Sequence, residues 1–301
     1  MEIVEKIKKL KEEKNAVILA HYYVEPEIQE IADYIGDSFY LSKIAVGLKE
    51  QTIVFCGVSF MGESAKILNP NKTVLMPDLS ADCAMAHMAD AETIQKMRDT
   101  YEDLAVVCYI NSTAELKQHS DVCVTSANAV KIVKALPNKN IFFIPDKNLA
   151  RFVAEQVPEK NFVFNKGFCP IHDKLCLEEV LKAKEEHPEA EILTHPECAQ
   201  AVCEISDYIG STSGIIKYAS ASEQKEFLIG TEAGVFCELK KQNPDKAFYP
   251  INIHQDCPGM KLVTLEKIYD VLLHETNEVQ LDKMTMERAK QPLTRMLELA
   301  K

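Results

Sequence analysis

The chain has 301 residues, of which 47% are hydrophobic and 27% charged, the composition of an ordinary globular protein. No apolar run approaches the roughly 20 residues that a membrane-spanning helix needs, so we expect no contact with a membrane. The formal net charge of −12 argues against a nucleic-acid partner, because nucleic-acid affinity rests largely on basic patches. The charged N-terminal stretch lacks the apolar core of a signal peptide, which predicts a cytoplasmic protein.

The first predicted elements lie in the N-terminal quarter of the chain. An apolar run at 16–20 predicts a buried strand that ends at His21, and 25–32 has the period of a helix. A strand over 33–36, a helix over 39–49, a strand over 52–56, a helix over 60–68 and a strand over 73–76 follow. Such alternation predicts an α/β layer of about four parallel strands joined by right-handed crossovers.

The same pattern occurs three times along the chain, at intervals of 86 to 88 residues. Each copy has a strand-end residue, an Asp 12 residues later, a hydroxyl residue 17 residues later, and a closing cysteine. In order, these residues are His21, Asp33, Ser38 and Cys83; Tyr109, Asp121, Ser126 and Cys169; and His195, Asp207, Thr212 and Cys257. Agreement at four positions in three copies predicts homologous units over residues 1–83, 84–169 and 170–257.

The C-terminal tail, 262–301, lies outside the repeat and contains two amphipathic stretches. Both are predicted to be helices that pack across the first unit. Pro292 is expected either to kink the second helix or to mark its start.

Equivalent positions of the three copies would converge if the units closed into a ring. Ligands of open α/β sheets bind beyond the carboxyl ends of the strands, so the strand-end residues and the hydroxyl residues would face one cavity. The third position after each strand carries Tyr23, Asn111 and Glu197, and polar but different groups suit an asymmetric pocket. The three hydroxyl residues could be plain helix N-caps, anion-binding groups, or both.

The three closing cysteines lie in polar or turn-rich loops, and a set of three thiolates suits a metal centre. Zinc with three cysteines and a water is one alternative. A [4Fe–4S] cluster suits a threefold arrangement better, because its fourth iron would stay open as a Lewis acid. The other cysteines are predicted to be small buried residues: Cys56, Cys108, Cys123, Cys176, Cys198, Cys203 and Cys237. Supporting roles near the metal are open for His172 and His254.

Several motifs resemble, in the same order and at matching spacing, those of the quinolinate synthase family of de novo NAD biosynthesis. They are AHYYVEPEIQEIADYIGDS, YINSTAELK, CVTSANAV, FCPIH, HPEC and YIGSTSG. The resemblance implies three α/β/α units in a pseudo-threefold triangle, with a [4Fe–4S] cluster on Cys83, Cys169 and Cys257. The implied substrate-binding residues are His21, Ser38, Tyr109, Ile110, Asn111, Ser126, His195, Pro196, Glu197 and Thr212. The resemblance also makes Tyr23 a catalytic tyrosine.

The same resemblance implies that iminoaspartate condenses with dihydroxyacetone phosphate to give quinolinate, with loss of phosphate and two waters. Glu197 would then be the general acid or base, and Tyr23 and Tyr109 would relay protons. An L-aspartate oxidase or dehydrogenase would be a transient partner that supplies the unstable imine. Some members carry C-x-x-C-x-x-C near the last ligand, but here Pro258, Gly259 and Met260 follow Cys257, so no disulfide switch is expected there.

Two other functions fit part of the pattern. An iron–sulfur hydro-lyase would use the same Lewis acid on a small hydroxy acid. An iron–sulfur carrier without enzymatic activity would need few polar groups near its cluster, and the His, Tyr, Ser and Glu residues at the strand ends argue against it.

Overall fold

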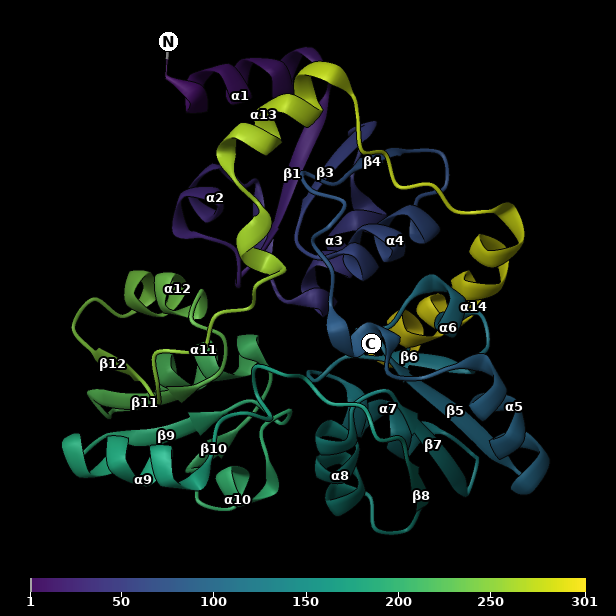
Figure 1. Cartoon of the computed structure of the whole chain (residues 1–301), viewed down its shortest axis with the longest axis vertical. Coiled ribbons are helices and arrows are strands. Elements are labelled where there is room, and N and C mark those ends of the chain that lie inside the picture. Colours follow the sequence, from purple (N-terminus) through teal and green to yellow (C-terminus); the bar gives the residue numbers. More distant parts are fainter. Residues whose placement is uncertain (1) are drawn as a thin grey trace.

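The computed structural model describes residues 2–301 and consists of three α/β/α units arranged as a triangle (Figure 1). The first predicted unit is therefore described from residue 2 onward. Each unit contains one sheet of four parallel strands with helices on its faces, which confirms the predicted fold class. No helix in residues 2–301 is both long and apolar enough to cross a membrane.

The elements of the first unit follow the N-terminal helix α1 (Ile3–Glu13). They are β1 (Ala16–His21), α2 (Pro26–Ile31), β2 (Tyr34–Gly36), α3 (Ser38–Gly47), β3 (Thr52–Cys56), α4 (Ser59–Leu68) and β4 (Thr73–Leu75). The spatial order of the strands is β2-β1-β3-β4. Every element predicted in this unit is confirmed to within two residues at each end.

The second unit opens with a short 3-10 helix (Ala84–His87) and repeats the arrangement. Its elements are α5 (Ala91–Thr100), β5 (Leu104–Tyr109), α6 (Ala114–Lys117), β6 (Val122–Val124), α7 (Ala129–Ala135), β7 (Asn140–Ile144), α8 (Lys147–Gln156) and β8 (Asn161–Phe164). The third unit contains α9 (Leu177–Glu186), β9 (Glu191–Thr194), α10 (Gln200–Cys203), β10 (Tyr208–Ile209), α11 (Thr212–Ala221), β11 (Glu226–Gly230), α12 (Val235–Gln242) and β12 (Ala247–Pro250). Their strand orders, β6-β5-β7-β8 and β10-β9-β11-β12, match the first unit.

The aspartate of each repeat fixes the start of the second strand against the first. The Asp33 carboxylate accepts the backbone N–H of Ile18 at 2.8 Å, and its own backbone N–H bonds to the carbonyl of the same residue at 2.9 Å. Asp121 and Asp207 make the same pair of bonds in their units. The repeated aspartate is therefore a structural residue: it pairs with the backbone N–H and C=O of one residue in the first strand, where the chain enters the edge strand.

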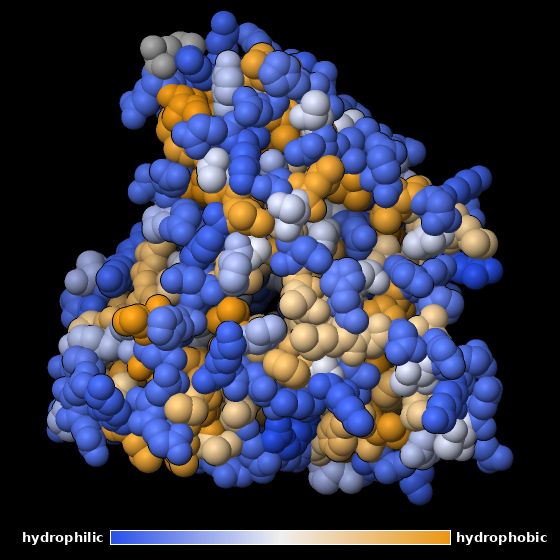
Figure 2. Space-filling model, in the orientation of Figure 1, coloured by the Kyte–Doolittle hydropathy of each residue, from blue (hydrophilic) through white to orange (hydrophobic). Residues whose placement is uncertain are grey.

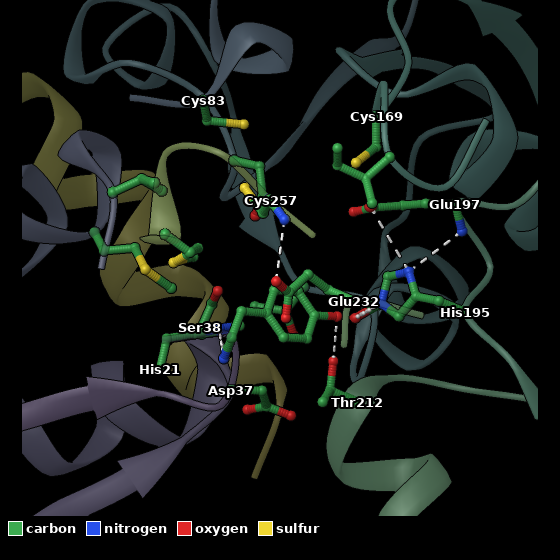
Figure 3. A pocket seen from close by; sticks show the side chains of 18 of the residues that line it. His21, Asp37, Ser38, Cys83, Cys169, His195, Glu197, Thr212, Glu232 and Cys257 are labelled. Carbon is green, nitrogen blue, oxygen red and sulfur yellow. Dashed lines mark hydrogen bonds and ion pairs between the residues drawn. The ribbon is translucent and has the colours of Figure 1, made fainter. Parts of the chain in front are cut away.

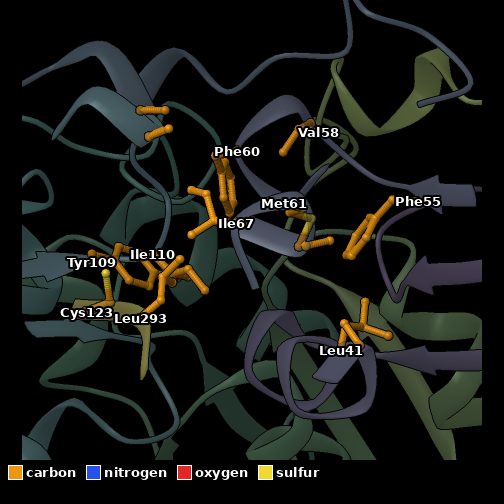
Figure 4. Close-up of a cluster of buried hydrophobic side chains, with 14 of the residues drawn as sticks. Leu41, Phe55, Val58, Phe60, Met61, Ile67, Tyr109, Ile110, Cys123 and Leu293 are labelled. Atoms are coloured by element: carbon orange, nitrogen blue, oxygen red, sulfur yellow. The ribbon is translucent and has the colours of Figure 1, made fainter. Parts of the chain in front are cut away.

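The apolar core is continuous between the first and second units. Figure 4 shows Phe60, Met61 and Ile67 of α4 beside Tyr109 and Ile110 of the second unit. The buried residues of both units belong to one cluster, whereas the third unit has two separate clusters of its own. The third unit therefore meets the others mainly through the loops that surround the site described below.

The tail spans two units. Helix α13 (Leu265–His274) packs against α1, and α14 (Lys283–Leu299) packs against α4 but also against α6, β6 and α7 of the second unit (Figure 1). The tail therefore contacts the first unit as predicted, but α14 also packs on the second unit. Pro292 is buried inside α14 and does not mark its start.

Candidate active site

A cavity lies where the three units meet, and the face seen in Figure 2 is hollowed near its centre. The cavity contains about 660 Å³ of space that protein atoms do not fill. Nine residues from equivalent repeat positions line it: His21, Tyr109, His195, Ser38, Ser126, Thr212, Cys83, Cys169 and Cys257. The structure thus brings together all three sets that the repeat predicted to converge.

The third-position residues Tyr23, Asn111 and Glu197 also line the cavity. The side chains of Ile110 and Pro196 do not, and both residues are buried in the protein. The structure therefore does not place these two predicted binding residues at the cavity wall.

The hydroxyl residues are not helix N-caps, so that interpretation is wrong. Asp37 caps α3 by accepting the backbone N–H of Tyr40, and Ser211 caps α11 by accepting that of Gly214. Ser38 and Thr212 are instead the first helical residues. Ser126 lies two positions before Asn128, the residue that precedes α7. Since neither Ser38 nor Ser126 caps a helix and both line the cavity, their hydroxyls can donate to a ligand.

The two strand-end histidines share one tautomer. Nδ1 of His21 accepts the backbone N–H of Tyr23 at 3.2 Å, and Nδ1 of His195 accepts that of Glu197 at 3.3 Å. Burial, with the neighbouring imidazole adding, lowers the pKa of His21 to about 3; burial likewise lowers that of His195 to about 3. Both rings are therefore neutral at pH 7 and carry their proton on Nε2, where it can be donated. His195 Nε2 lies 3.1 Å from Ser126 Oγ.

Glu197 is the buried carboxylate of the cavity. Its Oε2 lies 2.7 Å from Nδ1 of His172 and 3.8 Å from Nδ1 of His195, and it also accepts the Tyr109 hydroxyl. Burial acts to raise the pKa of Glu197, but the two histidines and these hydrogen bonds outweigh it and lower the pKa to about 2. The side chain is therefore a carboxylate that can accept a proton.

Both cavity tyrosines are held in their protonated form. Burial and the nearby charge of Glu197 raise the pKa of Tyr23 and of Tyr109 well above the usual value. The Tyr23 hydroxyl lies 2.7 Å from Thr212 Oγ1 and 2.8 Å from Thr231 Oγ1. A phenol in such a setting is a hydrogen-bond donor that gives up its proton only to a strong base.

The three cavity thiols are free and partly buried, one from each unit, and their sulfur atoms lie at the same end of the cavity in Figure 3. The backbone N–H of Cys169 bonds to Asp146 Oδ2 at 3.1 Å, and that of Cys257 bonds to Glu232 Oε1 at 3.0 Å. Burial raises the pKa of all three thiols, that of Cys83 to about 12. Thiolates here need a cation to balance them, and three soft sulfur donors fit an iron–sulfur cluster.

Two cavity residues, His172 and Glu232, and the adjoining Thr231 were missed or left open by the sequence. His172 is buried within hydrogen-bond reach of Cys169 and Thr231, whereas His254 is exposed and does not line the cavity. Thr231 and Glu232 follow β11, at the positions that Gly57 and Val58 hold after β3. The repeat has an equivalent position after the third strand of each unit. The other two copies carry Gly57 and Pro145 there, so no shared polar residue marks the position.

The cysteines outside the cavity are mostly in the interior. Cys56, Cys108, Cys123 and Cys198 are buried, and Cys203 and Cys237 are partly buried. Cys176 is exposed just before α9, so the prediction of a buried residue is wrong there. Its position at a helix start, outside any strand, accounts for the difference.

Two buried polar atoms near the cavity lack a partner among residues 2–301. Within these residues, Asn111 Oδ1 accepts no hydrogen bond, and Thr125 Oγ1 neither accepts nor donates one. Both residues line the cavity. A buried polar atom without a partner is costly, so these atoms indicate where a polar ligand would bind.

Comparison with known proteins agrees with this arrangement. A family model described as quinolinate synthetase A protein matches residues 5–298. The chain is 53% identical to quinolinate synthase of Clostridioides difficile over 294 residues, which cover 98% of this chain and 97% of that protein. It is 53% identical to quinolinate synthase of Caldicellulosiruptor bescii over 97% of each chain, and 48% identical to that of Thermodesulfovibrio yellowstonii over 98% of each.

Proposed function

The chain belongs to the quinolinate synthetase A family, and we propose from this that it condenses iminoaspartate with dihydroxyacetone phosphate. The products would be quinolinate, phosphate and two waters. The observation that carries the proposal is the convergence of equivalent residues from three units on one cavity. The nine residues supply thiols, hydroxyls, imidazoles and a phenol, a set that can bind a metal centre and an anionic substrate together.

The proposed cofactor is a [4Fe–4S] cluster held by Cys83, Cys169 and Cys257. When bound, it supplies an iron with an open coordination position, a Lewis acid that helps hydroxide to leave. The proposal is supported by three free thiols, one from each unit, at one end of the cavity.

Neutral donors would bind the carboxylates and the phosphate. His21 can donate Nε2–H and Ser38 its hydroxyl, whereas His195 Nε2–H donates to Ser126 Oγ and leaves the Ser126 hydroxyl proton for the anion. Hydrogen bonds from buried donors to an anion are stronger than those in water, so a chain with a net charge of −12 can still bind anions here. Asn111 would orient the substrate through the Oδ1 atom that has no protein partner.

Glu197 would act as the general base and then as the general acid. His172, His195 and Tyr109 keep it deprotonated, which is the state that a general base needs before it takes a proton from a substrate carbon or nitrogen. Tyr109 donates to Glu197 and could return a proton through it. Tyr23 would donate its proton from the position in which Thr212 and Thr231 hold its hydroxyl.

An L-aspartate oxidase or dehydrogenase would supply the imine, because iminoaspartate hydrolyses in water. The cavity between the three units would then protect the imine until it has condensed. Since the substrates are small and soluble, the encounter with such a supplier would be transient.

The test is product formation by anaerobically reconstituted protein. We expect quinolinate, identified by mass and by its ultraviolet band, from dihydroxyacetone phosphate and freshly generated iminoaspartate. Glu197→Gln should keep the fold and lower kcat by about 10² or more. If the protein with a full cluster forms no quinolinate but dehydrates small hydroxy acids, the hydro-lyase alternative is correct instead.

A further inference from the structure

A second set of metal donors overlaps the three cysteines. Cys169 Sγ, His172 Nδ1 and a carboxylate oxygen of Glu197 all lie within 4.8 Å of one another. The imidazole nitrogen is 3.2 Å from the sulfur and 2.7 Å from Glu197 Oε2. Only Cys169 belongs to both sets, so the two sets can be separated by mutation.

All three residues line the same cavity. Without a metal, His172 Nδ1–H donates to Glu197 Oε2 at 2.7 Å; a metal cation would displace this proton and take both atoms as ligands. The donors are one sulfur, one nitrogen and one oxygen, a combination that suits zinc and does not suit magnesium or calcium. Three protein ligands beside an open cavity leave a fourth position for water, as in catalytic zinc sites.

The surroundings of His172 favour ligation through Nδ1. Its Nε2 lies 2.9 Å from Thr231 Oγ1, and Thr231 is fully buried. When a metal binds Nδ1, the imidazole proton moves to Nε2 and can be donated to this hydroxyl. Metal-binding histidines are generally fixed by such a bond on the other ring nitrogen. The Tyr23 hydroxyl, 2.8 Å from Thr231 Oγ1, holds the threonine in turn.

We propose that Cys169, His172 and Glu197 bind one Zn²⁺ when the three cysteines carry no cluster. The carboxylate has to turn slightly outward to make room for the ion, and the adjoining cavity allows this. Zinc and the cluster exclude each other because both need Cys169. The consequence for catalysis rests on the proposed function: zinc would be bound by Cys169, which the cluster needs, and by Glu197, which is the proposed general base. The binding of zinc does not rest on it.

The experiment uses the full chain after its metals have been removed under anaerobic conditions. Zinc is titrated in competition with a chromophoric chelator, and Co²⁺ serves as a spectroscopic probe of the same donors. We expect one ion per chain, tetrahedral Co²⁺ bands and a thiolate-to-cobalt charge-transfer band. Cys83→Ser and Cys257→Ser are the matched controls: they should lose the cluster but keep zinc affinity and the cobalt spectrum.

The variants C169S and E197Q remove direct zinc ligands. They should weaken zinc binding by more than the roughly 10–100-fold seen when a residue that only hydrogen-bonds to a ligand is lost. Thr231→Val keeps the shape of the side chain but removes its hydroxyl, and should weaken zinc binding by about 10–100-fold, with Thr231→Ser restoring it. Circular dichroism checks that each variant is folded, and T231V remains informative if C169S is not.

Three outcomes would overturn the site. They are no stoichiometric zinc binding, loss of zinc in C83S or C257S as large as in C169S, and unchanged affinity in E197Q. The second outcome would mean that the ion uses the three thiols. Because none of these measurements involves quinolinate, a failure here is distinct from a failure of the proposed function.

Discussion

The hydroxyl oxygens of Tyr23 and Thr212 lie 2.7 Å apart, although 189 residues separate them in the chain. Tyr23 follows β1 of the first unit, and Thr212 opens α11 of the third. The same phenol also contacts Thr231 of the third unit. Since side chains of one unit hold a loop of another inside the cavity, the site is complete only when these two units are docked.

Tyr23→Phe should therefore lower turnover more than stability. The ring keeps its packing, including the edge contact with His21 at 4.4 Å between centroids, while the proton and two hydrogen bonds are lost. We expect kcat for quinolinate formation to fall by about 10²–10⁴, the range for loss of a general acid or base. Steady-state kinetics and thermal unfolding of the same preparation measure the two effects.

The neighbouring Tyr22 provides the control. Its hydroxyl bonds to Ser213, and the residue does not line the cavity. Tyr22→Phe should retain most of the activity. Equal kcat values in the two variants would mean that Tyr23 takes no part in the chemistry and serves only in the docking of the first unit on the third.

Gly259 permits a close approach of two cysteine loops. A β-carbon at Gly259 would collide with the carbonyl oxygen of Asp82, the residue before Cys83, and would lie 3.0 Å from a methyl carbon of Val58. Gly259→Ala should thus push the Cys257 loop away from the Cys83 loop. We expect the iron content after anaerobic reconstitution to fall well below that of the wild type.

Gly47→Ala is the matched control, because a β-carbon there meets nothing within 4 Å. At the end of α3, alanine should leave the iron content unchanged and stabilise the protein by up to about 1 kcal/mol. A fully loaded G259A protein would show that the two loops can separate without loss of the cluster.

The repeat explains why so much of the site could be predicted from the sequence. His21 and His195 occupy the same position in their units, and parallel strands place that position at one edge of each sheet. Because the units repeat the same arrangement around one cavity, residues at equal positions in the repeat lie close together in space. Thr231 was not predicted because the repeat offers no shared residue type there: Gly57 and Pro145 stand where the third unit has Thr231. For His172 the sequence left a supporting role near the metal open, on the same footing as His254.

The tail shows another limit. The amphipathic pattern of α14 indicates that Ala289, Leu293 and Met296 are buried, and they are. It does not indicate which surface covers them, because any apolar groove of suitable shape satisfies the same pattern. Leu293 lies in the shared core of the first two units (Figure 4), a position set by the docking of those units and not by the tail itself.

The burial of His21 predicts a dependence of stability on pH. Burial, together with His195, lowers its pKa in the folded protein to about 3, whereas the unfolded chain has the usual value of about 6.5. Below pH 6.5 the unfolded state binds a proton that the folded state does not, so stability falls as pH falls toward 3. Between pH 7 and pH 5 this one residue should lower the free energy of unfolding of the metal-free protein by about 2 kcal/mol.

His21→Asn should remove that part of the pH dependence, since the Asn oxygen can still accept the backbone N–H of Tyr23. Urea unfolding at pH 7 and pH 5 measures it in both proteins. His274→Asn, at an exposed position, should keep the wild-type difference. The same difference in H21N as in the wild type would mean that His21 is protonated in the folded state.

The last prediction concerns the cysteines, which fall into two groups. Cys83, Cys169 and Cys257 line the cavity from three different units, whereas Cys56 and Cys108 are fully buried inside strands. A three-cysteine [4Fe–4S] cluster would give a brown protein with about four irons per chain that bleaches in air, because one iron is open. Replacing any one of the three by serine should abolish or badly destabilise the cluster.

Alanine at Cys56 or Cys108 removes only packing, since neither thiol lines the cavity. Such a change should cost about 1–3 kcal/mol of stability and leave iron and colour unchanged. Iron analysis and visible spectra of the five variants separate the two groups. A colourless wild-type protein, or a cluster that survives loss of Cys169, would contradict the proposed cofactor. It would also contradict the convergence of three units on one metal centre, since that arrangement requires one thiol from each unit.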